Sequence, residues 1–212
     1  MSDTESTLDP GIDPTIPDIR IALSEGWTEV DLAPEATDAM LSGAFGTLDE
    51  LGLDTGDDEA PLRRAYEMQA RAAFQRAREE GALAMVQFAA KTDDEPRLLL
   101  ATLLIYVRQL TDPLADMVHQ LAADKEVEFM DLGAQRAAVR VTHLSHTLLP
   151  GIDEAVPMHT VRYYQEIDDT PYVAVLAFTT PNVPVAEDFT ELFDQMAATF
   201  SITLPADVLP KA

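Results

Sequence analysis

The stretch VLAFTTPNVPVAEDFTELFDQMAATFSI, residues 175–202, decides the fold class. It opens as an apolar strand and then reaches two prolines, which cannot donate a backbone hydrogen bond to a sheet and therefore end the strand. Two acidic residues follow, and acidic residues favour the start of a helix. Apolar residues then recur at helical spacing, which predicts a terminal helix over 185–200. Its buried face is expected to consist of Phe189, Leu192, Phe193, Met196 and Phe200.

Upstream of this stretch, the sequence predicts antiparallel strands. Apolar segments lie in pairs around short sequences rich in Asp, Pro and Gly, a spacing that is typical of hairpins. The expected pairs are 82–91 with 97–110, 126–133 with 135–149, and 158–167 with 172–180. A shorter hairpin is expected over 19–32, with its turn at Ser24, Glu25 and Gly26.

Helices are expected before and between these strands, over 33–52, 61–81 and 111–124. Pro61 suits a first helical position and Gly81 suits a helix end. Because apolar sheet faces must be covered, the fold class is α+β, with a mainly antiparallel sheet flanked by helices on both faces, an α/β/α sandwich. The expected organisation is a flexible acidic tail at 1–17, a single domain at 18–205 with a helical region at 34–81, and a C-terminal tail at 206–212.

Composition excludes several classes of function. The chain has 212 residues, a formal net charge of −24 and no cysteine. Such a charge repels nucleic acids and anionic lipids, so neither is an expected partner. The absence of cysteine excludes disulfides, thiolate catalysis and cysteine-ligated metals. The longest apolar run, 98–107, is too short to span a bilayer, and the acidic start lacks signal-peptide features, so a cytoplasmic protein is expected. Abundant arginine and alanine suggest a GC-rich bacterial source.

The order of elements resembles one known superfamily. Its members include the photosystem II extrinsic protein PsbP, the yeast Ran guanine-nucleotide release factor, and bacterial lipoproteins such as LpqN and DcrB. The residues that carry the resemblance are Gly26–Trp27, VAVLAFTTP (173–181) and FTELFDQMAATFSI (189–202). The resemblance implies an antiparallel sheet with helices on both faces and a partner-binding role, and it transfers no catalytic residue. This chain departs from the lipoproteins in lacking their cysteine and signal, and in its long helical region.

Sequence motifs for catalysis or metal binding are lacking. His143 and His146 lie three apart on an expected strand, so their side chains point to opposite faces and do not chelate one ion together. Ser145 lies between them without the surrounding residues of a nucleophile motif. The glycines of 42–52 have no preceding strand and no Lys-Ser/Thr, which a phosphate-binding loop requires. We therefore expect no metal, no cofactor and no catalytic residue.

One local feature opposes the global charge. Arg64, Arg71 and Arg78 recur every seven residues, with Arg63 beside them, and form a basic stripe on the expected helix 61–81. They either pair with the chain's own acids, as Glu67 and Arg71 would at i, i+4, or form a docking face. The docking face would accept an acidic partner, or the acidic tail of a second copy in a homodimer.

Three functions remain open. The first is a non-enzymatic protein-interaction module, such as an adaptor, a secretion chaperone or an assembly factor. The second is binding of a small hydrophobic ligand in a groove between the sheet and the terminal helix, although the residues that would line it also suit a core. The third is a hydrolase that uses His143 or His146. The candidate groove residues are Tyr106, Tyr163, Phe189, Phe193 and Met196.

Overall fold

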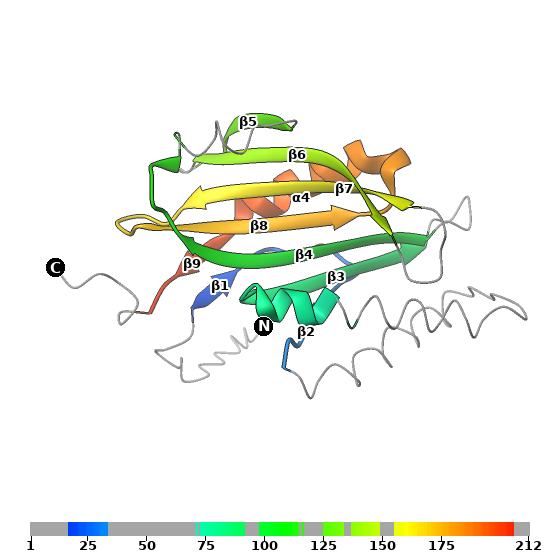
Figure 1. Cartoon of the computed structure of the whole chain (residues 1–212), viewed down its shortest axis with the longest axis horizontal. Helices are drawn as coiled ribbons and strands as arrows, with labels where there is room; N and C mark the ends of the chain where they lie inside the picture. The colour runs from blue at the N-terminus through cyan, green and yellow to red at the C-terminus, as the bar shows by residue number, and fades with distance from the viewer. Residues whose placement is uncertain are drawn as a thin grey trace, which may run out of the picture.

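The computed structural model describes residues 17–33, 71, 73–91, 98–114, 116, 125–133, 137–148 and 155–205. Figure 1 shows the chain, with most of its strands gathered into one large sheet and a helix near the C-terminus. The strands are β1 Asp18–Arg20, β2 Trp27–Val30, β3 Ala84–Lys91, β4 Leu98–Gln109, β5 Glu126–Asp131, β6 Ala137–Leu148, β7 Ala155–Glu166, β8 Tyr172–Thr180 and β9 Ser201–Thr203. A 3-10 turn, Val183–Val185, precedes the helix α4, Ala186–Thr199.

The main sheet has seven strands in the order β2-β3-β4-β8-β7-β6-β5, and every neighbouring pair is antiparallel. The predicted pairs β3–β4, β5–β6 and β7–β8 are confirmed. β8 inserts between β4 and β7, which places the most apolar strands in the middle of the sheet. The α+β class with a mainly antiparallel sheet is therefore confirmed.

The predicted hairpin over 19–32 is wrong. β1 pairs with β9 in a separate two-stranded sheet, and β2 pairs with β3. Trp27 explains the difference, because its ring lies 5.4 Å from that of Phe88 and holds β2 against β3. Gly26 allows this approach, since it has a φ of +90° and an added Cβ would lie 2.8 Å from Phe88.

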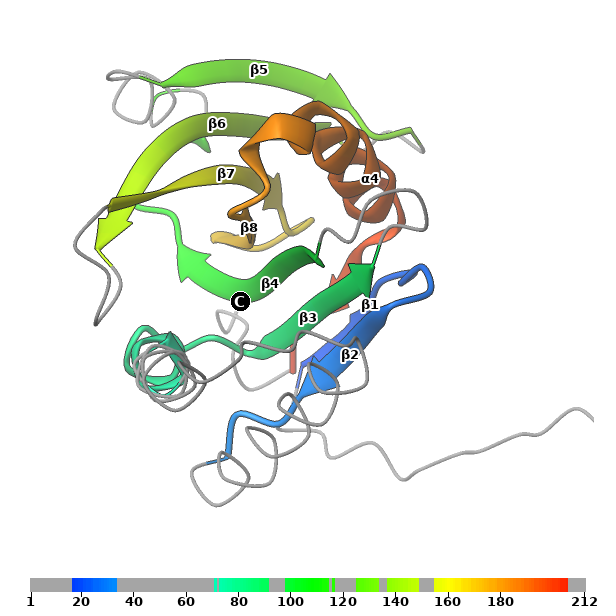
Figure 2. The ribbon, with the colours of Figure 1, turned by 90° about the vertical axis from the view of Figure 1, so that its right-hand side faces the viewer.

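Side chains alternate between the two faces of the sheet, and one face packs against α4. We call this the helix face. Its core includes Leu103, Ile105, Val161, Leu176 and Phe178, all essentially inaccessible to solvent. Figure 2 shows the sheet curving around α4, so that strands from both halves of the sheet contribute to one apolar layer.

Helix α4 forms as the sequence predicts. The 3-10 turn supplies a proline at its start, and Glu187 and Asp188 occupy the first helical turn. Its buried residues are Phe189, Phe193, Met196 and Ala197. Phe193 stacks on Phe178 of β8 with a ring distance of 4.3 Å, so the helix is fixed to the centre of the sheet.

We call the other side the opposite face. It carries a second apolar cluster that includes Tyr106, Val141, Tyr164 and Val175. Residues 73–79 are helical, and Phe74 packs with Val30 and Met85. This helix ends at Gly81, as predicted, because Gly81 has a φ of +70° and its flanking amides bond back to the helix.

Several predicted segments lie outside the described residues. These are the tail at 1–16, most of the helical region at 34–81, most of the helix at 111–124, and the tail at 206–212. In the described part of the chain, no helix is both long and apolar enough to cross a membrane.

Candidate functional site

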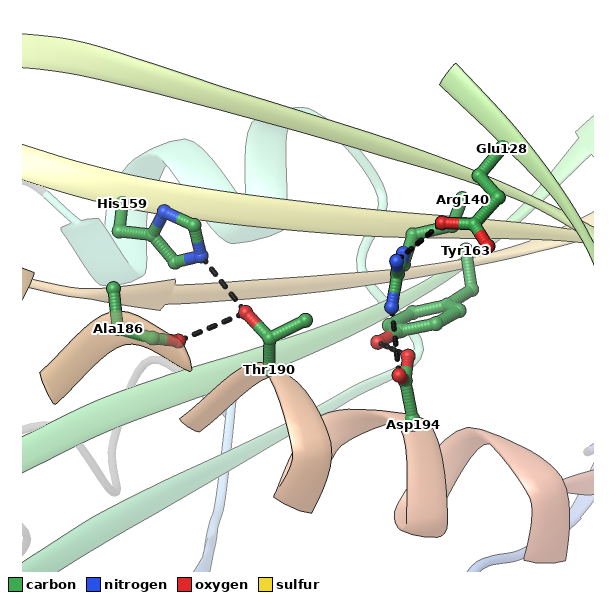
Figure 3. A network of polar contacts seen from close by, with 7 residues as sticks. All are labelled: Glu128, Arg140, His159, Tyr163, Ala186, Thr190 and Asp194. Atoms are coloured by element: carbon green, nitrogen blue, oxygen red, sulfur yellow. Dashed lines mark hydrogen bonds and ion pairs between the residues drawn. The ribbon is translucent and has the colours of Figure 1, made fainter. Parts of the chain in front are cut away.

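A polar network crosses the mainly apolar contact between α4 and the sheet (Figure 3). Asp194 projects from α4 toward Arg140 of β6 and Tyr163 of β7. The Tyr163 hydroxyl donates to Asp194 Oδ1 at 2.5 Å, and Arg140 Nη1 donates to Asp194 Oδ2 at 2.6 Å. Both carboxylate oxygens of Asp194 are therefore engaged by the sheet.

The network continues to the edge of the sheet. Arg140 Nη2 donates to Glu128 Oε2 of β5 at 2.5 Å, so its guanidinium bridges two carboxylates. The register explains the arrangement, since Glu128 is opposite Arg140 and Arg140 is opposite Tyr163. These residues follow one row across the helix face. We refer to Glu128, Arg140, Tyr163 and Asp194 as the polar network.

Every member of the network is paired, and burial fixes the protonation of its phenol. Burial, together with the hydrogen bond to Asp194, raises the pKa of Tyr163 well above its usual range. Burial alone would lower the pKa of Arg140, but the hydrogen bond and charge of Asp194 outweigh burial and raise it. The phenol stays neutral and the guanidinium charged near neutral pH, so the network holds α4 to the sheet.

His159 of β7 makes a second polar contact with α4 (Figure 3). Its Nε2 lies 3.1 Å from Thr190 Oγ1, and that hydroxyl donates to the carbonyl of Ala186 at 2.8 Å. A hydroxyl has one hydrogen, so Thr190 accepts from His159. This assigns the Nε2–H tautomer to the imidazole. Burial lowers the pKa of His159 below its usual value.

We expect the His159 ring to remain in the neutral Nε2–H form below the pH at which a free histidine is half protonated. Because the folded-state pKa is lowered, the unfolded chain binds more protons as the pH falls below about 6.5, and the free energy of unfolding falls with it. Two-dimensional ¹⁵N NMR reports the tautomer, and urea unfolding at pH 7.5 and 5.5 reports the stability. His159→Gln should show a smaller loss of stability over this range, and an identical loss would contradict the assignment.

The structure does not bring all the candidate groove residues together. Tyr163, Phe189, Phe193 and Met196 join one closely packed cluster on the helix face, where each is buried. Tyr106 belongs to the cluster on the opposite face. Burial, with the charge and hydrogen bond of Glu80, raises the pKa of Tyr106 to about 12. The first four residues therefore pack as core between the sheet and α4.

The predicted basic stripe is only partly described. Arg63 and Arg64 lie outside the described residues. Arg71 is exposed, and Arg78 is half-buried, with its Nη1 donating to the carbonyl of Leu32 at 3.3 Å. Arg78 thus contributes to the local fold, and a docking face formed by these arginines stays a prediction.

The histidines of β6 are placed as their spacing predicts. His143 lies opposite Thr160 and His146 opposite Pro157, three residues apart along the strand and thus on opposite faces. Ser145 Oγ lies 3.4 Å from the carbonyl of Met158. In the part of the chain that the structure describes, no three His, Asp or Glu side chains gather closely enough to hold a metal ion.

The edge strand β5 carries a large apolar side chain that is exposed to solvent. Phe129 is 67% exposed, the highest value among the large apolar residues of the described chain. β5 pairs with β6 from Glu126–Thr142 to Asp131–Ala137 without a bulge, and no described strand pairs with its outer side. We call this strand, with its unpaired outer side, the β5 edge.

Sequence reasoning missed both the polar network and the β5 edge. The alternation of β6 indicated that Arg140 faces away from Val139 and Val141, but nothing local named its partners. Asp194 is 54 residues away in sequence. Charged and apolar residues alternate from Glu126 to Phe129, and this pattern does not show that the strand lies at an edge of the sheet.

Comparison with known proteins adds no assignment. No protein-family model matches the chain, and no curated protein is significantly similar to it. The geometry of the described residues therefore carries the functional conclusion. It offers a fully paired polar network, which fixes α4, and the β5 edge, which leaves backbone groups and Phe129 open to a partner.

Proposed function

We propose that this protein is a non-enzymatic protein-interaction module that binds a partner chain along the β5 edge. The observation that carries the proposal is the exposed Phe129 on an unbulged edge strand. Large apolar side chains exposed beside unpaired backbone groups are typical of surfaces that accept an added strand. Adaptors, secretion chaperones and assembly factors are the classes of protein that this surface fits.

Natural edge strands avoid uncontrolled pairing by means of proline, lysine or bulges. β5 contains neither proline nor lysine, and its only charged side chains are Glu126, Glu128 and Asp131. These acids, and the net charge of −24, repel a second copy of the chain. They favour instead a partner segment in which basic and apolar residues alternate, because opposite charges on adjacent strands attract.

The polar network supports this role by holding the edge in place. Glu128 is fixed on its inner side by Arg140, which is fixed in turn by Asp194 of α4 (Figure 3). A pre-organised strand loses less entropy on binding than a mobile one. The β5 edge is therefore presented as a rigid template.

The proposal also includes the arrangement of helices and sheet in layers. We infer an α/β/α sandwich of the PsbP-like type, with helices over both faces of the sheet. The contact of Phe74 with Met85 supports it, because Met85 and Val86 point to opposite faces and Val86 belongs to the core beneath α4. A cytoplasmic location in a bacterium fits the composition.

Site-specific photo-crosslinking tests the interaction. A benzophenone amino acid is placed at Phe129 of the full chain in the native host, and at Leu23 as a matched control, because Leu23 is also exposed but lies away from β5. We expect position 129 to crosslink one reproducible partner within an extended segment rich in basic and apolar residues. If both positions capture the same proteins, the proposal fails.

Affinity measurements with the captured segment show how much Phe129 contributes to binding. Phe129→Lys removes the apolar contact, and we expect binding to weaken about 10- to 100-fold, the effect of losing one buried aromatic side chain. The unfolding midpoint should not change, since Phe129 is exposed. Unchanged affinity of this variant for the captured segment would count against the β5 edge as the contact surface.

A further inference from the structure

The opposite face carries a row of polar side chains in register across the sheet. Each member lies opposite the next on the neighbouring strand, so the row runs from one side of the sheet toward β5. Its members are Thr28, Gln87, Thr102, Thr179, Thr160 and His143. The row beside it on the same face, which includes Leu104, Ala177 and Val141, is mainly apolar, so the two rows meet at a boundary between polar and apolar side chains.

Arg162 stands beside this boundary. On β7 it lies opposite Val141 on one side and Ala177 on the other, and it is a diagonal neighbour of His143. Diagonal neighbours on one sheet face lie about 7–8 Å apart, within reach of a long side chain. The guanidinium is half-buried, and it forms no ion pair with any residue that the structure describes. In a chain with 38 acids and 14 bases, an arginine that finds no carboxylate partner within the described part of the structure is unexpected.

His143 has an open bonding position in the same place. Its Nδ1 is buried, and among the described residues it has no hydrogen-bond partner. Burial lowers the pKa of His143, and the positive charges of Arg162 and Lys125 lower it further. The register agrees, because Arg162 is a diagonal neighbour of His143 and Lys125 directly precedes Glu126, which lies opposite Thr142. A buried nitrogen that finds no partner among the described residues, beside two positive charges, is costly unless a further group occupies the site.

We propose that Arg162, Lys125 and His143 bind an oxyanion, a carboxylate or a phosphate, attached to an apolar chain. The guanidinium matches two oxygens of such a group, and the ammonium adds a point charge. His143 Nδ1 completes the set as a hydrogen-bond donor when the neutral ring carries its hydrogen on Nδ1. The apolar chain lies along Ala177, which is only partly buried and belongs to the row beside the polar one, whereas Val141 in the same row is already covered.

This binding site uses other residues than the β5 edge. Phe129 lies opposite Val139 and is therefore on the same face of the sheet as Arg162 and His143. Arg162 and His143 belong to the inner strands β7 and β6, whereas the interaction proposed above uses the outer side of β5. A variant that no longer binds the anion should still crosslink its protein partner from position 129. The crosslinking experiment therefore distinguishes failure of the anion site from failure of the β5 edge.

Titration of the full-length protein with three simple anions tests the site. Inorganic phosphate and acetate present the oxyanion alone, and octanoate presents it on an apolar chain. We expect saturable binding by isothermal calorimetry, at least tenfold tighter for octanoate than for acetate, because each buried methylene adds to the affinity. Binding of octanoate no tighter than acetate would refute the apolar part of the proposal, and no saturable binding of any of the three would refute the site.

Two charge variants assign the binding to these residues. Arg162→Gln should weaken octanoate binding about 10- to 100-fold, the effect of losing a charged hydrogen-bonding partner. Arg20→Gln removes the same charge at an exposed position paired with Asp18, and it should bind as the unaltered protein does. Equal losses in both variants would indicate nonspecific attraction and overturn the proposal.

A spectroscopic readout on the unaltered protein does not depend on the folding of any variant. Octanoate should shift the ¹⁵N resonances of the His143 ring and leave those of His159 unchanged, since His159 contacts α4 on the helix face. Absence of a selective His143 shift at saturating octanoate would overturn the assignment to this site.

Discussion

Replacement of Phe193 by alanine is expected to lower the free energy of unfolding by about 3–5 kcal/mol, the range for deleting a buried aromatic side chain. Phe193 is 0% exposed and stacks on Phe178 at 4.3 Å. Its ring also lies 5.6 Å from that of Phe189 and 6.5 Å from that of Trp27. The cavity would lie at the centre of the contact between α4 and the sheet, where neighbouring rings cannot all move to fill it.

Equilibrium unfolding in urea measures this effect, and the chain provides its own reporter. Trp27 is the only tryptophan, and it lies in the same aromatic cluster, so its fluorescence follows the loss of this packing. Phe129→Ala is the matched control, because it removes the same atoms from a side chain that is 67% exposed. We expect a change of no more than about 0.5 kcal/mol there. Equal effects at the two positions would contradict the described packing of α4.

The elements that the sequence predicted correctly are those with local signals. Strands β7 and β8 follow from two apolar segments on either side of an Asp-Asp-Thr-Pro turn, and α4 follows from apolar residues at helical spacing after two prolines. Each of these signals lies within a short window. The antiparallel class of the sheet then follows, because strands joined by short turns pair with their neighbours.

The pairings that the sequence did not predict depend on residues far apart in the chain. β1 pairs with β9, from Asp18–Thr203 to Arg20–Ser201, and no period within either strand specifies the other. The same limit applies to the candidate groove. Tyr106 and Tyr163 are both aromatic residues of central strands, and only the register of β4, β8 and β7 shows that they face opposite sides.

The candidate sites depend on the order of the strands in the sheet, which sequence patterns do not give. Alternation along β6 places Arg140 on the face away from Val139, but the role of Arg140 depends on two carboxylates from β5 and α4. Phe129 is exposed because β5 ends the sheet, and an edge position is a property of strand order. Sequence patterns predict which residues share a face, whereas a site requires the order of the strands.

Replacement of Asp194 by alanine is expected to lower the free energy of unfolding by about 2–4 kcal/mol. The change leaves the buried hydroxyl of Tyr163 without its acceptor and removes one of the two carboxylates that balance Arg140. Unpaired buried donors and charges cost more than the net contribution of the bond they have lost. Arg140 is 17% exposed and keeps Glu128, so the expected loss is smaller than for an isolated buried charge.

Glu191→Ala provides the control on the same helix, because Glu191 is exposed and makes no contact with the network. It should change the stability by no more than about 0.5 kcal/mol. A double-mutant cycle with Tyr163→Phe then isolates the hydrogen bond. Once Asp194 is gone, removing the Tyr163 hydroxyl should cost less than it does in the unaltered protein, with a coupling energy of about 1–3 kcal/mol. Additive effects would mean that the phenol and the carboxylate do not interact in solution. In that case the apolar core alone would fix α4, and the β5 edge would lose the support that Arg140 transmits to Glu128.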